Sequence, residues 1–138
     1  MNYQPVRIYC CSEDSKVHFP SNTAADLRVN LSETLAIPNH WVCALTDVKL
    51  PQSLKDTTYL CCDLCDSSLT GNSGRLPILR RLPINWSSIL PLVYVPVKKD
   101  FFNTVHFYLR DTNGKPITQL EGNLECTLVL KPDTPWTG

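Results

Sequence analysis

The sequence predicts an all-β protein, an antiparallel β-sandwich formed by a single domain over residues 1–138. Three observations lead to this prediction. Apolar and polar residues alternate with a period of two in many short segments, which is typical of strands with one buried face. Eleven prolines and only five glycines are scattered along the chain, which favours short strands over long helices. No helical period extends beyond one or two turns.

Four strands are expected in the first half of the chain, at residues 6–10, 27–31, 41–50 and 57–66. The third is the strongest, and its predicted core face consists of Val42, Ala44, Val48 and Leu50. Its first half is apolar on both faces, which predicts a strand at the centre of a sheet or one covered by a neighbour. Residues 32–39 are expected to hold one helical turn, which Pro38 stops because proline disfavours the helical region for the preceding residue.

Four further strands are expected in the second half, at residues 75–84, 92–97, 104–110 and 123–130. Pro77 and Pro96 interrupt the first two, and because proline removes a donor from the ladder, we expect these to be short or at sheet edges. The segment between the last two is longer than a hairpin loop needs, so they need not pair with each other. Their predicted core residues are Val105, Phe107, Leu109, Leu124, Cys126, Leu128 and Leu130. Thr127 is placed on the opposite face.

Eight short strands separated by turn residues correspond to the number in a jelly roll, so the predicted fold is an eight-stranded β-sandwich of the single jelly-roll type. An immunoglobulin-type sandwich is the main alternative. The sequence lacks the cysteine pair that brackets a tryptophan in antibody domains.

The charge balance argues against nucleic-acid binding. Lys plus Arg and Asp plus Glu number 13 each, so no net positive charge attracts the chain to phosphates. No segment approaches the ~18 to 20 uninterrupted apolar residues of a membrane span, and residues 1–20 contain no apolar signal-peptide core. We expect a protein that is made in the cytosol or nucleus and binds no membrane.

The seven cysteines, at positions 10, 11, 43, 61, 62, 65 and 126, are an odd number that cannot all pair within one chain. We expect free thiols that pack as small hydrophobic side chains in a reducing compartment. Cys62 and Cys65 form a CxxC spacing, but no second ligand pair accompanies it, as a structural zinc site requires. Oxidation of exposed cysteines stays open as an alternative.

No catalytic, cofactor or metal residues are assigned. His18, His40 and His106 are isolated in the sequence, and no serine lies in a nucleophile elbow. The loop from Gly71 to Gly74 lacks the lysine of a phosphate-binding loop. Arg80 and Arg81 are ordinary for a solvated strand face. The sequence therefore predicts a protein that is not an enzyme.

Aromatic residues outside the expected core form the candidate interface. Together with Tyr3 they are more than a small monomer usually leaves exposed, and aromatic residues are enriched at the buried centres of protein interfaces. The candidate interface residues are Tyr94, Phe101, Phe102, Trp86 and Trp136.

Two runs of sequence resemble the penton-type minor capsid proteins of Polinton/Maverick elements and adintoviruses. The first extends from His18-Phe19-Pro20-Ser21-Asn22-Thr23 to Trp41-Val42-Cys43-Ala44-Leu45 and ends at Pro51. The second extends from Tyr94-Val95-Pro96-Val97 through Val105-His106-Phe107-Tyr108-Leu109-Arg110-Asp111 to Leu128. The resemblance covers about residues 6–132 and consists of strand and turn patterns.

This resemblance implies a single jelly roll that forms a homopentamer at the five-fold vertices of an icosahedral virion capsid. The partner it implies is a double-jelly-roll major capsid protein, with synthesis in the host cytoplasm or nucleus. The cysteine cluster at residues 61–65 departs from the family pattern, and an Arg-Gly-Asp loop is absent, so host-cell attachment is not implied.

Two other classes remain as alternatives. A host β-sandwich binding module, lectin-like or cytokine-like, would be a monomer or trimer with a ligand cleft. A small thiol enzyme would use one of the cysteines. The oligomeric state separates the first of these from a vertex protein.

Overall fold

The computed structural model describes residues 5–37, 40–54, 56–71, 74–83, 92–118 and 120–133. These residues form one short 3₁₀ helix, η1 (Asp14–Val17), and no α-helix. The strands are β1 (Val6–Cys11), β2 (Asp26–Ala36), β3 (Trp41–Lys49), β4 (Thr58–Cys62), β5 (Ser68–Thr70), β6 (Gly74–Leu76), β7 (Ile78–Leu82), β8 (Val95–Pro96), β9 (Phe101–Arg110) and β10 (Glu125–Pro132). No helix among the described residues is long and apolar enough to cross a membrane.

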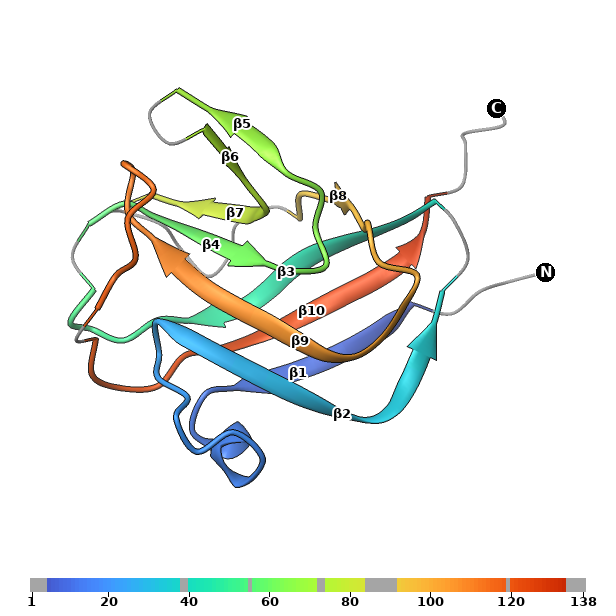
Figure 1. Cartoon of the computed structure of the whole chain (residues 1–138), viewed down its shortest axis with the longest axis horizontal. Coiled ribbons are helices and arrows are strands. Elements are labelled where there is room, and N and C mark those ends of the chain that lie inside the picture. The colour runs from blue at the N-terminus through green and yellow to red at the C-terminus, as the bar shows by residue number, and fades with distance from the viewer. Residues whose placement is uncertain are drawn as a thin grey trace.

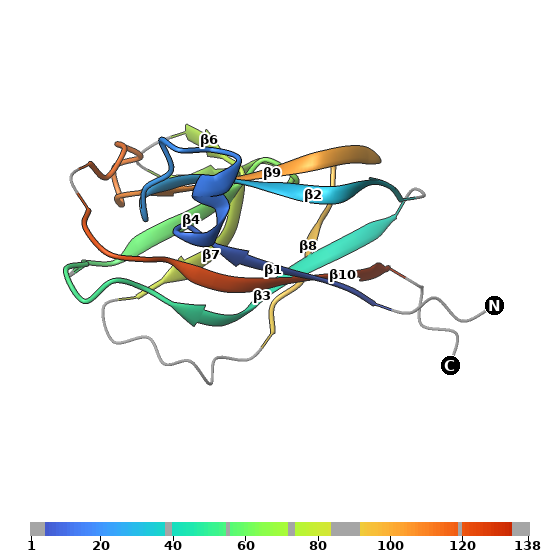
Figure 2. The same cartoon turned by 90° about the horizontal axis from the view of Figure 1, so that it is seen from below.

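Two four-stranded antiparallel sheets pack against each other, as Figures 1 and 2 show. The first sheet has the strand order β1-β10-β3-β8, and the second has the order β2-β9-β4-β7. Strands β5 and β6 form a separate two-stranded sheet that projects from the sandwich. The prediction of an all-β antiparallel sandwich is therefore confirmed.

The core lies between the two sheets, and the closing strands contribute the face that the alternation predicts. The seven core residues predicted in the last two strands are all buried in one cluster: Val105, Phe107, Leu109, Leu124, Cys126, Leu128 and Leu130. Strands β9 and β10 belong to different sheets. As the length of their connection allows, the two strands do not pair with each other, and the connection crosses from one sheet to the other.

The helical turn expected at residues 32–39 is wrong where the structure describes this segment. Strand β2 continues to Ala36, and its pairing with β9 shifts between Asn30, opposite Thr104, and Leu35, opposite Phe102. A single helical turn fixes several residues for one hydrogen bond. By extending as a strand, β2 instead gains two further residue pairs with β9, so the extended strand is favoured over a helical turn.

Strand β3 is central, between β10 and β8, as its apolar character on both faces predicts. The predicted core face is wrong in its first half, because Trp41, Cys43 and Leu45 join the core cluster instead of Val42 and Ala44. The pairs Thr46–Thr127 and Lys49–Glu125 leave one extra residue on β3. This bulge changes the phase of the alternation, so that Val48 returns to the core.

The three strands expected between residues 57 and 97 are shorter than predicted. Segment 75–84 divides at Pro77 into β6 and β7, and segment 92–97 is reduced to β8, which includes Pro96. Strands β7 and β8 each lie at the edge of a sheet. The edge positions confirm the argument from the missing proline donors, whereas the short strand β5 was not predicted.

Candidate interface at two opposite edges of the sandwich

The structure places the predicted interface aromatics in different environments. Phe101 is 70% exposed at the start of β9, opposite Ala36 of β2. Tyr94 is half-buried, and the Lys131 ammonium group lies 4.2 Å from the centroid of its ring. Trp86 and Trp136, like Tyr3, lie outside the described residues.

Phe102 does not belong in this set, because it is buried in the core cluster. The burial pattern of β9 changes phase between Phe102 and Val105, and the pairing with β2 shifts at the same place. This shift directs Phe102 inward together with the odd-numbered residues that follow. The alternation of apolar and polar residues in the sequence does not indicate this register shift.

Among the exposed apolar residues that the sequence did not single out, Tyr9 and Leu69 lie on opposite sides of the molecule. Tyr9 of β1 is 76% exposed, and Leu69 of β5 is 73% exposed. Figure 1 shows β5 and β6 on the side of the sandwich opposite to β1 and β2. The only sequence signal for Tyr9 is its outward position in the alternation of the first strand.

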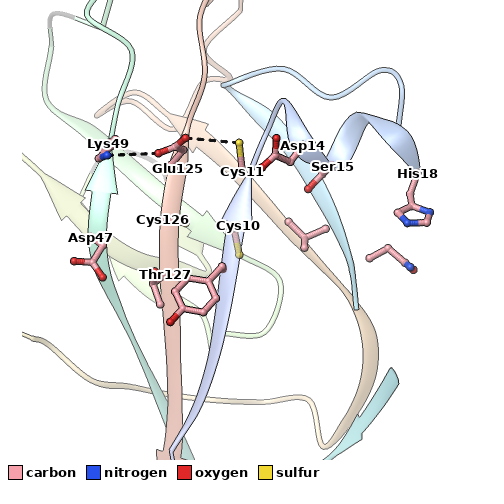
Figure 3. A pocket seen from close by; sticks show the side chains of 13 residues that line it. Cys10, Cys11, Asp14, Ser15, His18, Asp47, Lys49, Glu125, Cys126 and Thr127 are labelled. Carbon is pink, nitrogen blue, oxygen red and sulfur yellow. Dashed lines mark hydrogen bonds and ion pairs between the residues drawn. The ribbon is translucent and has the colours of Figure 1, made fainter. Parts of the chain in front are cut away.

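A groove of about 540 Å³ lies beside β1 and η1. Its walls come from β1, η1, β2, β3 and β10, and Figure 3 shows Asp47 and Thr127 on one side and Ser15 and His18 on the other. The thirteen lining residues include the exposed Tyr9 and the buried core residues Val29 and Cys126. The groove therefore combines the exposed side chain of Tyr9 with polar side chains at its rim.

Carboxylates outnumber ammonium groups in the groove. Asp14, Asp47 and Glu125 line it together with a single lysine, Lys49. Lys49 Nζ lies 3.8 Å from Glu125 Oε2, an exposed pair of small energetic value. Asp14 and Asp47 form no ion pair with any other described residue. The groove is therefore negatively charged.

Asn123 holds the wall of the groove where β1 ends and β10 begins. Its Oδ1 accepts hydrogen bonds from Ser12 Oγ at 2.7 Å and from the Glu13 backbone N–H at 3.0 Å. Ser12 Oγ in turn accepts a bond from the Leu124 N–H at 2.9 Å. Because Ser12 is buried and its partners are all within the fold, this end of the groove is fixed in shape.

The segment from Gly74 to Leu82, at the opposite edge of the sandwich, is basic. Arg75 of β6 and Arg81 of β7 are exposed, and no aspartate or glutamate occurs from Gly74 to Leu82. Leu69 lies directly opposite Arg75 in the β5–β6 ladder. Directly opposite residues of an antiparallel pair share a face, so an apolar and a cationic side chain stand together on the projecting hairpin.

The cysteines are free thiols, and six of the seven are buried. Burial raises the pKa of Cys61 to about 12. Hydrogen bonds with Cys43 and Cys62 hold the pKa of Cys65 well above its ordinary value, and the Sγ atoms of Cys43 and Cys65 lie 3.7 Å apart. The Cys61 and Cys65 thiols stay protonated and therefore lack the thiolate that nucleophilic or redox chemistry requires. No group of three metal-binding side chains occurs among the described residues.

The histidines do not come together. His106 Nε2 lies 2.7 Å from Asp26 Oδ1 on the outer face of β9, where it ties β9 to β2. The His106 ring lies tilted against the Tyr108 ring, with the ring centroids 5.1 Å apart, and the Arg110 guanidinium lies over the Tyr108 ring. His18 lines the groove, and His40 is exposed with a φ of 69°. Of the three histidines, His106 therefore has a structural contact, which joins β9 to β2.

No protein-family model matches this chain, and no curated protein matches it in sequence.

Proposed function

We propose that this chain is a structural capsid subunit, a single jelly roll that assembles as a homopentamer at the five-fold vertices of an icosahedral virion. Its partner in the shell is a double-jelly-roll major capsid protein. The proposal takes its class from the resemblance of the two sequence runs to penton-type minor capsid proteins. The observation that supports it best is the order in which the strands pair.

The strand pairs of the sandwich are nested. Apart from the β5–β6 hairpin, the first strand pairs with the last, β1 with β10, and the second with the last but one, β2 with β9. Further inward, β3 pairs with β8 and β4 with β7. Nested antiparallel pairs form one long ribbon, and successive pairs alternate between the two sheets. Rolling up such a ribbon produces a jelly roll, the fold used by viral capsid and lectin domains.

The distribution of exposed apolar residues supports assembly. A closed ring repeats one heterologous interface, in which one surface of a copy fits a different surface of its neighbour. Tyr9 and Leu69 lie at two opposite edges of the sandwich, and Phe101 is exposed as well. Opposite edges are the places where neighbouring copies of a ring meet.

Size exclusion coupled to light scattering tests the proposal. We expect a particle with the mass of five chains at micromolar concentration. A protein that stays monomeric at every accessible concentration would contradict the vertex function.

A binding module, lectin-like or cytokine-like, is the second candidate, because lectins share the jelly-roll fold and the groove of about 540 Å³ beside β1 could hold a ligand. This candidate predicts a monomer or trimer whose melting temperature rises on addition of the ligand. A thermal-shift screen with soluble glycans, run beside the mass measurement, separates the two candidates.

A further inference from the structure

We infer that the β5–β6 hairpin of one copy docks into the groove beside β1 of a second copy of this chain. The inference rests on the proposed function, because it names the two surfaces that form the repeated interface of the ring. Three observations support it: the isolation of the hairpin, the chemistry of its exposed face, and the chemistry of the groove.

Within the part of the chain that the structure describes, the β5–β6 hairpin belongs to neither sheet of the sandwich. Strands β5 and β6 pair only with each other, and their residues are all exposed or half-buried. A two-stranded ribbon alone is marginally stable in water. Leu69 buries little of its surface, although its side chain is one of the most apolar in the segment. A second surface that covers Leu69 would stabilise the ribbon.

The exposed face of the hairpin matches the groove in charge and polarity. Leu69 and Arg75 are opposite partners on this face. The groove presents the exposed side chain of Tyr9, with Asp14 and Asp47 as carboxylates that have no ion-pair partner among the described side chains. Insertion therefore covers Leu69 and brings the Arg75 guanidinium close to carboxylates, the pairing that arginine forms best.

The positions of the two surfaces require a second copy. The hairpin and β1 lie on opposite edges of the same sandwich, as Figure 1 shows, so the hairpin cannot reach the groove of its own chain. One edge of each copy meets the other edge of its neighbour, which is a heterologous contact. Repetition of this contact closes a ring or extends a filament, and the mass of the particle distinguishes these outcomes.

Charge reversal on the full-length chain tests the contact. Arg75→Glu and Asp14→Lys each place like charges opposite one another, and we expect each to weaken self-association about tenfold or more. The double variant restores opposite charges with their signs exchanged, so its self-association should return to within about threefold of the parent. Lys115→Glu is the matched control, because it makes the same change at an exposed site in the β9–β10 connection. Sedimentation velocity over a concentration series measures all four variants.

The outcomes are decisive in each direction. Recovery in the double variant supports the docking, since two independent folding defects would add instead of cancelling. If the parent assembles and both single variants assemble equally well, the groove has another occupant and the inference is wrong, while the vertex function stands. If the parent remains a monomer, the inference and the proposed function both fail.

Discussion

Thr127 and Leu128 are neighbours on β10 that point to opposite faces, and both are buried. Leu128 belongs to the core between the sheets. Thr127 pairs with Thr46 and lies beside Val129 and Ala44 on the outer face, where Val129 and Ala44 are also buried. The alternation in the sequence correctly assigns Thr127 to the face opposite Leu128. It contains no information on whether that face is covered, and the structure shows that Thr127 is buried there.

The two residues are expected to differ in their contribution to stability. Leu128→Ala removes a fully buried side chain and should lower the free energy of unfolding by about 2 to 5 kcal/mol. Thr127→Ala removes less apolar surface and should cost about 0.5 to 2 kcal/mol, above the range of surface sites. Denaturant unfolding of both variants beside the parent measures the difference. Equal losses would contradict the assignment of the two faces.

The Cys61 thiol should make stability depend on pH in alkaline solution. Burial raises its pKa from 9.0 to about 12 in the folded chain, so the folded state keeps its proton where the unfolded state loses it. The contribution is complete below pH 9 and is lost as the pH rises from 9 to 12, by roughly 1.4 kcal/mol per pKa unit at most. Urea unfolding at several pH values should give a shallower decline for Cys61→Ala than for the parent. Identical slopes would contradict the burial of this thiol.

At the scale of elements, the sequence predicts strands best where the alternation is regular and long. The first strand is recovered, and segments 104–110 and 123–130 are recovered with their buried faces, because the alternation in the sequence is unbroken within each. The predictions that were wrong concern positions where a strand contains a bulge or a register shift. The bulge in β3 and the register shift in β2 are set by pairing with partners distant in the sequence, and a local pattern does not report on such partners.

The candidate site was also predicted only in part, because its residues come from elements that are distant in the sequence. The sequence indicates Phe101 as an exposed aromatic, but it does not indicate the groove, whose walls come from five separate elements. Tyr9 and Asp47 meet there only after β1, β10 and β3 have paired. The hairpin was missed because its two strands are three residues long each, too short for a detectable alternation.

The bulge in β3 depends on the backbone of Asp47, which has a φ of 53°. Aspartate and asparagine tolerate this left-handed region, whereas a β-branched residue does not. Asp47→Asn should leave the free energy of unfolding nearly unchanged, and Asp47→Val should lower it by about 1 to 2 kcal/mol. Thermal and denaturant unfolding compare the two variants. A Val variant as stable as the Asn variant would show that the strand accommodates a regular ladder here.

In the whole molecule, the nested pairing of the strands gives the sandwich two unlike edges. The pairing brings β1 and β2 to one edge of the sandwich and β7 and β8 to the other. The first edge holds an acidic groove, and the second has exposed arginines next to a projecting hairpin. Two unlike edges on one small domain suit a head-to-tail ring better than a two-fold dimer, which would use one surface twice.

Native mass spectrometry of the purified 138-residue chain tests the proposed pentamer, because it counts the copies in each particle. The vertex function predicts a dominant species of five chains, each of 15.6 kDa, with dissociation only on dilution or at high salt. A single chain as the dominant species across the whole concentration range, or a particle with a different closed number of copies, would contradict it.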